Sequence, residues 1–357
     1  MQKTAFLSLT NLSGGAESVM FSLHNYLSPN SEFFFLTQKG DSNLDVDRIH
    51  FFSSSKFILR GAVKMLFYLR QLNEFDYIFS SHQFLNSYLG FLKKIGLLTY
   101  PTLIYRESTS IFLRNTGLKL LCYRISYFIG YGRQKLIITQ SELMRRQLKN
   151  NISSSVCWNI KTIPNPINID EINIKSNEYV VNEKKFIVAA GRLIPEKGFD
   201  ILIKAYNQIK EKINYKRLII LGDGADKAIL QNLIKELNLN NHVSLMGHVD
   251  NPMPYFKQAE VCVVSSRIEG FPNVLLQMMA TNGNVVSTLC AGGIEKLNGV
   301  NICPPNNVDL LAQTLVEAIE SKCDRSLLFK NELEQRSIFN YWSQIQRYLV
   351  ESSSALP

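Results

Sequence analysis

The chain has 357 residues, of which 46% are hydrophobic and 19% charged, a composition that excludes disorder over most of its length. This length exceeds one ordinary hydrophobic core and predicts two domains. The net charge of +9 is uneven, because residues 1–164 hold 19 Lys and Arg against 9 Asp and Glu, a net of +10.

The first ten residues read as a short strand and not as an export signal. No uncharged apolar run is long enough to cross a bilayer. The six cysteines show no paired spacing, so we expect neither disulfides nor a zinc site. These features predict a cytoplasmic protein.

Short β-rich runs alternate with helix-length segments, the pattern of parallel sheets with crossover helices. In the first half the expected strands are Thr4–Thr10, Phe33–Leu36, Ile49–Phe52, Tyr77–Ser80, Thr102–Tyr105, Leu136–Ile138 and Lys161–Ile163. In the second half they are Phe186–Ala190, Arg217–Leu221, Val243–Leu245, Val261–Val264 and Asn284–Ser287.

We therefore expect an α/β protein with two doubly wound, Rossmann-like domains. The boundary is expected where Pro164-Asn165-Pro166 ends the last strand of the first half and a polar stretch follows. The predicted parts are residues 1–166, a linker at 167–184, a second domain at 185–323 and a helical segment at 324–357. Ligands of such sheets bind beyond the carboxyl ends of the strands, so two facing sheets would line one cleft.

One strand-to-helix turn carries the strongest chemical signal. Ser265-Ser266-Arg267-Ile268-Glu269-Gly270 follows an apolar strand, and Pro272 suits the first position of the next helix. Free N–H groups at such a helix start attract anions. A carboxylate just ahead of it, Glu269, accepts hydrogen bonds from ligand hydroxyls.

The spacing of Glu269 and Gln277 resembles the E-x7-E signature of the retaining GT-B glycosyltransferases, the glycogen-synthase-like glycosyl transferases group 1. The resemblance implies that Glu269 addresses the donor sugar and Gln277 the ribose of the nucleotide. It also implies that a C-terminal helix, within residues 324–357, returns to the first domain. Gln stands where the family has its second Glu. The helix start, through Gly270, Phe271, Pro272, Asn273 and Val274, would bind the donor. A capping loop with a solvated Glu is the structural alternative.

Arg192 and Lys197 flank the end of another predicted strand, where two cations can clamp a diphosphate. Their stretch, Gly191-Arg192-Leu193 to Lys197-Gly198, resembles a second motif of the same family. The resemblance implies that both side chains hold the diphosphate and offset the charge that grows on it. We predict Glu269, Arg192 and Lys197 as the catalytic residues.

Two glycine-containing turns complete the predicted donor site. Gly222 lies in the turn Leu221-Gly222-Asp223-Gly224. This turn lacks the third Gly of a dinucleotide fingerprint, which disfavours an oxidoreductase. A tight turn and a close approach to the nucleotide remain alternatives for it. The stretch Met246-Gly247-His248-Val249 resembles the strand end whose backbone meets the nucleobase in the family, so Val249 is expected in the donor site.

In the first domain, Gly14 and Gly15 follow the first strand and leave room for a phosphate or a backbone. They resemble the glycine-rich loop with which the family approaches the donor phosphate and the acceptor, which implies that Gly14 and Gly15 bind the donor. A plain structural turn is the alternative. Two later strand ends offer His82 and the pair Arg106-Glu107, which we expect on the acceptor side. Many relatives have His where this chain has Arg106-Glu107, so the roles of that pair stay open.

Asp45-Val46-Asp47 spells the D-x-D motif of metal-dependent GT-A transferases. Here it lies in a polar link, and Arg192 and Lys197 already supply the cations. We therefore expect no metal and no cofactor beyond the nucleotide sugar as co-substrate.

Residues 56–72 and 112–133 mix apolar and basic side chains in a way typical of helices on an anionic membrane surface. Ordinary packing with solvated lysines explains each segment equally well. The net charge of +10 on residues 1–164 favours an acidic partner. No aromatic-basic recognition motif supports nucleic-acid binding.

The combined interpretation is a glycosyltransferase, for hexoses or N-acetylhexosamines, that uses a UDP-linked donor and retains the anomeric configuration. The charge and the resemblance together predict a glycan or lipid-linked acceptor in surface polysaccharide assembly, at the inner face of the membrane. A sugar-nucleotide epimerase of the same fold is one alternative. A non-catalytic nucleotide-sugar-binding partner is another, because Gln277 departs from the motif.

Overall fold

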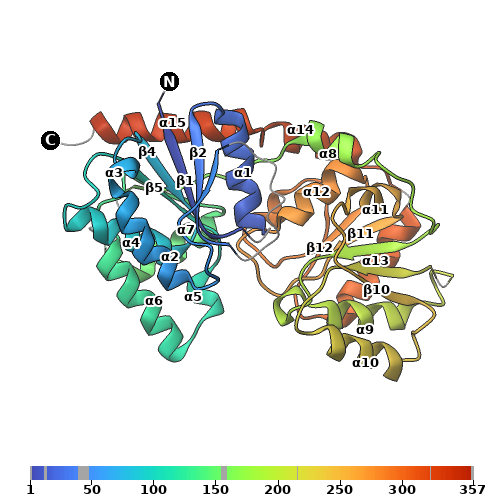
Figure 1. Cartoon of the computed structure of the whole chain (residues 1–357). Helices are drawn as coiled ribbons and strands as arrows, with labels where there is room; N and C mark the ends of the chain where they lie inside the picture. Colours follow the sequence, from blue (N-terminus) through green and yellow to red (C-terminus); the bar gives the residue numbers. More distant parts are fainter. Residues whose placement is uncertain are drawn as a thin grey trace. The chain divides into compact units, whose positions relative to one another are not determined.

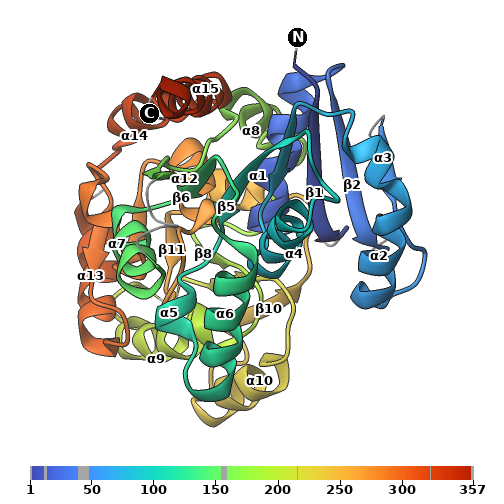
Figure 2. The same cartoon turned by 90° about the vertical axis from the view of Figure 1, so that its left-hand side faces the viewer.

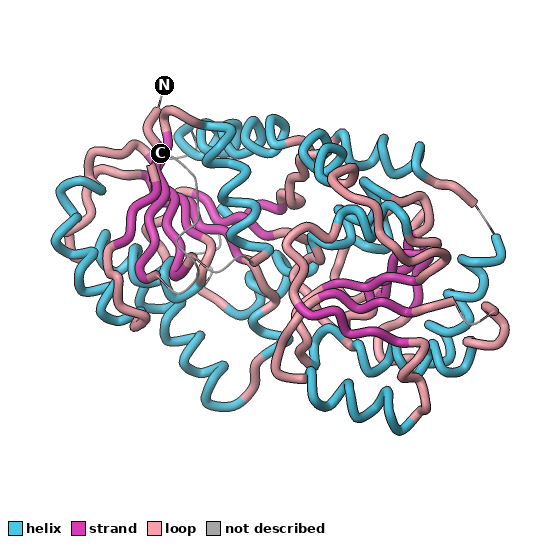
Figure 3. Tube along the Cα trace, turned by 45° about the vertical axis from the view of Figure 1, so that its right-hand side comes forward, coloured by secondary structure: helices cyan, strands magenta, loops and turns pink. Residues whose placement is uncertain are grey.

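Two parallel β-sheets, each covered by helices on both faces, form the core of the protein in this computed structural model (Figure 1). The structure describes residues 2–11, 14–38, 48–153, 159–214, 216–321 and 323–354. Contacts divide the chain into two units, Met1–Pro166 with Ile338–Pro357, and Ile167–Ser337. Each unit holds one sheet, and the strands of both sheets are drawn in magenta in Figure 3. The predicted pair of doubly wound α/β domains is confirmed.

The first unit has seven parallel strands in the order β3-β2-β1-β4-β5-β6-β7. Its strands are β1 Thr4–Thr10, β2 Ser31–Thr37, β3 Ile49–Phe51, β4 Tyr77–Ser80, β5 Thr102–Glu107, β6 Leu136–Thr139 and β7 Ile160–Thr162. Its helices are α1 Gly15–Leu27, α2 Ile58–Met65, η1 Leu66–Tyr68, α3 Leu69–Leu72, α4 Gln83–Lys94, α5 Ile111–Arg114, α6 Gly117–Gly130, α7 Glu142–Asn151 and α15 Ile338–Ser354.

Strand alternation explains the two hydrophobic layers of this unit. In β1, the side chains of Ala5 and Leu7 point to one face of the sheet, which α2, α4, α6 and α7 cover. The side chain of Phe6 points to the other face, which α1 and α15 cover. Figure 2 shows α2, α4 and α6 of the first layer. Backbone contact holds α4 to α6, because a Cβ on Gly90 would lie 1.7 Å from the carbonyl oxygen of Gly130.

The second unit has six parallel strands in the order β10-β9-β8-β11-β12-β13. Its strands are β8 Ile187–Ala190, β9 Leu218–Leu221, β10 Val243–Gly247, β11 Val261–Val264, β12 Val285–Thr288 and β13 Asn301–Cys303. Its helices are α8 Ile169–Lys175, η3 Pro195–Lys197, α9 Phe199–Ile209, α10 Lys227–Glu236, α11 Met253–Gln258, α12 Asn273–Thr281, η4 Ile294–Lys296, α13 Val308–Ser321 and α14 Ser326–Glu334.

The strands of this sheet are buried on both faces, as their continuous apolar sequences predict. One face packs against α9, α10 and α13, and the other against α8, α11, α12 and α14. The carboxyl edge of the sheet, where the loops after β8 and β11 begin, is thereby held by a fully packed core.

Three features differ from the sequence prediction. The predicted linker contains α8, whose Ile172 is buried in the core of the second unit. Strand β13 was not predicted. The predicted C-terminal helical segment is two helices, of which α14 packs on the second unit and α15 belongs to the first. Among the described helices none is both long enough and apolar enough to span a bilayer.

Candidate active site

Loops that leave two adjacent strands in opposite directions mark the ligand-binding edge of a doubly wound sheet. In the second unit these strands are β8 and β11, because β8 leads to β9 on one side and β11 leads to β12 on the other. Arg192 and Lys197 follow β8, and Glu269 follows β11. The fold thus places all three predicted catalytic residues on loops that start at this one point.

Lys197 and Glu269 are in direct contact. Lys197 Nζ lies 2.5 Å from Glu269 Oε1, and both side chains are mostly buried, at 17% and 16% exposure. The hydroxyl of Ser266 donates to the same carboxylate oxygen at 3.0 Å, and the amide of Glu269 donates to the carbonyl of Cys290 at 2.8 Å. Burial, with the charge of Glu269 adding to it, raises the pKa of the Cys290 thiol to about 12. Glu269 is therefore an oriented carboxylate and not a solvated loop residue.

Arg267, which the sequence analysis did not single out, braces the two loops. Its guanidinium donates to both carboxylate oxygens of Asp200, at 2.8 and 2.7 Å, and to the carbonyl of Pro195 at 2.6 Å. Burial opposes ionisation of Asp200, but the hydrogen bonds and charge of Arg267 outweigh it and hold the pKa of Asp200 below its usual value. Such bidentate pairs fix geometry as well as charge.

Gly198 lets the two loops approach closely. Its φ is +63°, and a Cβ there would lie 2.3 Å from the carbonyl oxygen of Ser265. In return, the hydroxyl of Ser265 donates to the carbonyl of Lys197 at 2.9 Å. Any larger residue at position 198 would push Lys197 away from the β11 loop. Arg192, by contrast, is exposed beside Gly191 at the end of β8.

The helix start ahead of Gln277 differs by one residue from the prediction. Helix α12 begins at Asn273, with Pro272 as its N-cap residue. The amide of Leu275 donates to the carbonyl of Pro272 at 3.0 Å, because the first turn is tight, so it is not one of the free N–H groups of the helix start. Gly270, Phe271 and Pro272 are buried, whereas Asn273, Val274 and Gln277 are partly exposed along the start of α12.

Gly222 and Val249 have mainly structural surroundings. Gly222 has a φ of +133°, and a Cβ there would lie 2.0 Å from the carbonyl oxygen of Gly191. This contact favours the tight-turn alternative, since it holds the end of β9 against the end of β8. Val249 packs on the core below α11 and α12. Its neighbour His248 is an exposed surface residue.

In the first unit the corresponding edge lies between β1 and β4, from which the chain again leaves in opposite directions. Gly14 is the N-cap residue of α1 and Gly15 its first residue. His82 is the N-cap residue of α4, just beyond β4, and its Nε2 lies 2.7 Å from Glu17 Oε1. The structure thus brings the glycine turn and His82 to one place.

Arg106 needs a correction, because it does not face an open acceptor site. Strand β5 continues two residues beyond its predicted end, so Arg106 and Glu107 lie inside the sheet. Arg106 is 1% exposed and donates to Ser81 Oγ at 3.0 Å and to Asn165 Oδ1 at 2.7 Å. Burial lowers the pKa of this guanidinium. Its role is to join strand ends within the unit.

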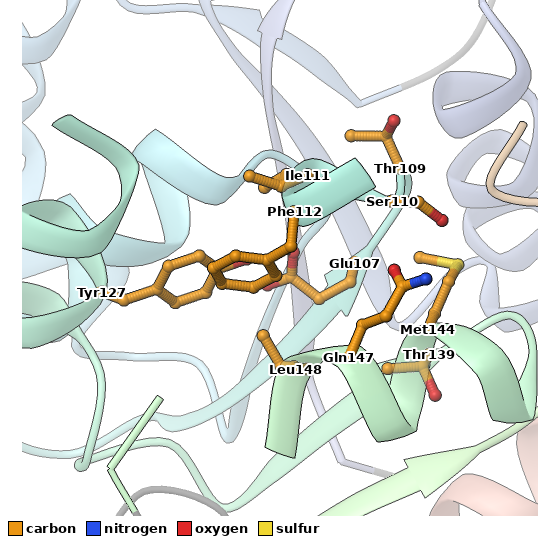
Figure 4. A pocket seen from close by; sticks show the side chains of 10 residues that line it. All are labelled: Glu107, Thr109, Ser110, Ile111, Phe112, Tyr127, Thr139, Met144, Gln147 and Leu148. Carbon is orange, nitrogen blue, oxygen red and sulfur yellow. The ribbon is translucent and has the colours of Figure 1, made fainter. Parts of the chain in front are cut away.

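Glu107 is buried as well, at the inner side of a small pocket between β5, α5, α6 and α7 (Figure 4). Its carboxylate accepts hydrogen bonds from Tyr127, at 2.9 Å, and from Tyr131. Burial raises the pKa of Glu107 despite these bonds. Glu107 therefore lines a pocket, but its carboxylate oxygens are engaged by the two tyrosines.

Asp45 and Asp47 lie outside the described residues. In the part of the chain that the structure describes, no three His, Cys, Asp or Glu side chains are grouped as metal ligands would be.

Comparison with known proteins gives the family. The family described as "Glycosyl transferases group 1" matches residues 170–336. The N-acetylgalactosamine-N,N'-diacetylbacillosaminyl-diphospho-undecaprenol 4-alpha-N-acetylgalactosaminyltransferase of Campylobacter jejuni is 30% identical over 317 residues, 84% of either chain. An uncharacterized glycosyltransferase of Methanocaldococcus jannaschii is 32% identical over 197 residues, which are 53% of this chain and 47% of that relative. This chain therefore matches less than half the length of the archaeal relative.

The same fold is found in a solved structure. Anabaena HepE in complex with UDP-glucose superposes with a TM-score of 0.79 at 19% sequence identity, and the match covers 100% of each chain. The family match, the Campylobacter relative and this likeness agree with the two doubly wound sheets and their loop positions. The chain belongs to the glycosyl transferases group 1 family and is a glycosyltransferase with the GT-B fold.

Proposed function

We propose that this protein transfers a sugar from a nucleotide-diphosphate donor to a hydroxyl of a saccharide acceptor and retains the anomeric configuration. The observation that carries the proposal is the contact of Lys197 with Glu269 where the loops after β8 and β11 diverge. A cation and an oriented carboxylate side by side suit a ligand with a phosphate next to a hydroxyl-bearing ring. The exposed Arg192 supplies a second positive charge at the same strand end.

The residues divide the work as follows. Lys197 and Arg192 bind the diphosphate and offset the negative charge that grows on it as the bond to the sugar breaks, which is the interaction that lowers the barrier. Glu269 accepts hydrogen bonds from sugar hydroxyls and orients the ring. The amides at the start of α12 add a favourable dipole for the phosphates. Gln277, farther along α12, faces the ribose.

We propose UDP as the nucleotide and a hexose or an N-acetylhexosamine as the sugar. HepE, which shares the fold, binds UDP-glucose, and the Campylobacter relative transfers N-acetylgalactosamine. The name of that relative describes a saccharide linked through a diphosphate to undecaprenol. We therefore propose a lipid-linked saccharide acceptor, used in surface polysaccharide assembly.

The exposed face of α2, η1 and α6 in the first unit has the composition of a membrane-binding surface. Exposed apolar residues are concentrated on α2, η1 and α6, where Phe67 and Phe128 are each 83% exposed and Leu118 is 81% exposed. Residues 56–133 hold 11 Lys and Arg against 3 Asp and Glu, a net of +8. Apolar side chains that enter the interface, flanked by cations that attract anionic lipid, are the features of a peripheral membrane protein. We propose that this face lies on the inner surface of the cell membrane, within reach of a lipid-linked acceptor.

The experiment is to incubate the whole chain with radiolabelled UDP-glucose, UDP-galactose, UDP-N-acetylglucosamine or UDP-N-acetylgalactosamine and a bacterial membrane extract. We expect label in the lipid fraction with one of these donors and none with the Lys197→Ala variant. Thermal-shift measurements with the same donors identify the nucleotide sugar independently of turnover. Donor binding without transfer to any extract would contradict the proposed acceptor, and no binding of any UDP-sugar would contradict the proposed donor.

A further inference from the structure

A carboxylate and an imidazole meet at the ligand-binding edge of the first sheet. Strands β1 and β4 are neighbours there, and the chain leaves β1 towards β2 and leaves β4 towards β5, on opposite sides. Glu17 lies in the first turn of α1, which follows β1, and His82 precedes α4, which follows β4 (elements labelled in Figure 1). Ligands of doubly wound sheets bind at this kind of divergence.

Glu17 is buried and held in place. Its Oε1 accepts from His82 Nε2 at 2.7 Å and from Ser8 Oγ at 3.1 Å. Its other oxygen lies against Gly14, where a Cβ would come within 2.7 Å of Oε2. Gly14 therefore leaves the space that this carboxylate occupies, which is a structural reason for glycine at this position.

Charges around the pair keep Glu17 ionised. Burial acts to raise the pKa of Glu17, but the hydrogen bonds from His82, from its own amide and from Ser8 outweigh burial and lower it. Arg106, buried at the end of β5, also interacts electrostatically with Glu17. A carboxylate in this state only accepts hydrogen bonds, so a neutral His82 carries its hydrogen on Nε2 and has Nδ1 as its acceptor nitrogen.

His82 is positioned to meet a ligand. Its side chain is 28% exposed, whereas that of Glu17 is only 9% exposed. Within the described residues, the ring of His82 hydrogen-bonds to Glu17 and to no other group. A partly exposed ring held by a buried carboxylate is the arrangement by which a carboxylate orients a histidine towards a substrate.

We propose that Glu17 is a positioning residue that holds His82 so that Nδ1 accepts a hydrogen bond from a hydroxyl of the acceptor saccharide. This inference rests on the proposed glycosyl transfer, and it assigns the acceptor side of that site to a residue pair. Fixing the hydroxyl lowers the entropy cost of bringing its oxygen into line for attack. No proton or group is transferred to the protein in this role.

Two substitutions at position 82 separate a ligand contact from a structural role. Asn retains an acceptor atom near the place of Nδ1 but loses the atom that bonds to Glu17. Gln retains an atom near Nε2, and with it the bond to Glu17, but has nothing at Nδ1. We expect His82→Asn to keep at least tenfold more transfer than His82→Gln at low acceptor. The opposite order would show that only the bond to Glu17 matters and would overturn the proposal.

Glu17→Gln and Glu17→Asp test the positioning residue. In assays where the amount of membrane lipid extract is varied, we expect Glu17→Gln to raise the apparent KM for the extract about tenfold and leave the KM for the UDP-sugar unchanged. Glu17→Asp should restore part of the loss. Equal changes in both KM values, or none, would contradict the assignment. Thermal unfolding of each variant checks that the fold is kept.

A second measurement needs no activity. Nitrogen-15 NMR of the histidine-labelled whole chain reports which ring nitrogen carries hydrogen, and the His82→Asn spectrum assigns the signal. We expect protonated Nε2 in the wild type and a mixture of tautomers in Glu17→Gln. Protonation at Nδ1 alone in the wild type would overturn the pairing even if transfer is confirmed.

The chain supplies a matched control. His50 and Glu32 form another histidine-glutamate pair, 2.9 Å apart, on β3 and β2 of the same sheet but away from the divergence of β1 and β4. Glu32→Gln and His50→Gln should leave both KM values within twofold of wild type. A loss equal to that of Glu17→Gln would show that the effect is on the sheet as a whole and would overturn the proposal.

Discussion

Lys197 Nζ lies 2.5 Å from Glu269 Oε1, although the two residues are 72 positions apart in the chain. The contact exists because parallel strands β8 and β11 are neighbours and their following loops are joined by Arg267 and Asp200. The cation proposed for the diphosphate and the carboxylate proposed for the sugar thus share one rigid edge. Rigid placement is what makes a charge effective on a transition state.

We predict that Lys197→Ala and Arg192→Ala each lower turnover by about a hundredfold or more, the scale for loss of one transition-state donor. The charge that they offset develops as the bond between sugar and phosphate breaks, so kcat should fall more than the donor affinity does. Steady-state kinetics with the donor selected by the screen give both values. The fold should remain, because neither side chain belongs to the hydrophobic core.

Lys212→Ala is the control for this prediction. Lys212 is an exposed lysine of the same unit, after α9 and outside the site. Its removal changes the net charge equally and should leave kcat within twofold. A Lys197→Ala or Arg192→Ala variant that is as active as Lys212→Ala would show that the diphosphate assignment is wrong.

The fold was largely predictable because both sheets follow one rule, an apolar strand followed by a helix. Strand β13 was missed because it has three residues and begins with the polar Asn301. The break between α14 and α15 was missed because apolar residues recur at helical spacing through both helices. Hydrophobic periodicity does not show which unit a helix packs against, because that depends on tertiary contacts.

The positions of the candidate site residues were predictable where a strand end and a motif marked them, and not where burial decided them. Lys197 and Glu269 were predicted from their positions at strand ends. Arg106 and Glu107 also stand at a strand end, but β5 runs two residues farther than its apolar residues indicate, which draws both charges inside. Arg267 was missed because its partner Asp200 is 67 residues away in sequence.

Glu107 allows a prediction about stability and pH. Burial raises the pKa of this carboxyl in the folded protein above the value of 4.5 that it has when exposed. From about pH 4.5 upward the unfolded chain loses the proton more readily than the folded chain does, so Glu107 lowers the free energy of unfolding as pH rises towards the folded pKa. Glu107→Gln should remove this fall. Chemical denaturation of both proteins between pH 4 and pH 8 measures it.

Glu142 should change the free energy of unfolding with pH in the direction opposite to that of Glu107. Burial acts against its ionisation, but Thr162 and Arg145 outweigh it and lower the pKa of Glu142. Its stabilisation is present above the unfolded pKa and is lost as pH falls through the folded pKa. Glu142→Gln should therefore cost stability at neutral pH and not at low pH. The same pH trend in both variants would contradict the burial assigned to Glu107.

Membrane binding should depend on the exposed apolar residues of α6 and η1. We predict that the protein binds vesicles with anionic lipid, that binding weakens as salt rises, and that Phe67→Ser or Phe128→Ser lowers the partition coefficient about tenfold. Cosedimentation with vesicles measures it. Phe339→Ser is the control, since Phe339 is an exposed phenylalanine of the same unit on α15. Equal binding to neutral vesicles would count against this surface.

Activity should persist in excess chelator. In the proposed site, Arg192 and Lys197 supply the positive charge that a divalent ion provides at other diphosphate sites. We therefore expect no loss of transfer in EDTA, and full activity in Asp45→Asn and Asp47→Asn. The assay is transfer before and after dialysis against chelator. Loss on dialysis with recovery on addition of manganese or magnesium would instead assign the two aspartates a metal.

Gln277 and Glu269 mark the two ends of the donor motif, and their substitutions should act on different quantities. Gln277 offers one carbonyl acceptor and an amide donor, whereas a carboxylate would offer two charged acceptors to the ribose hydroxyls. Gln277→Glu should therefore tighten UDP binding by about 1 kcal/mol, the value of one hydrogen bond.

Glu269→Gln should harm turnover more than nucleotide affinity. The substitution removes the charge that pairs with Lys197 and that we propose orients the sugar, whereas the proposed contact with the ribose is at Gln277. Calorimetry with UDP and kinetics with the UDP-sugar separate the two effects, and the matched pair of substitutions exchanges the same two functional groups. The residue that faces the nucleoside must control the affinity for UDP. If the Glu269→Gln variant turns over normally while Gln277→Glu abolishes UDP binding, the roles proposed for the two residues are therefore wrong.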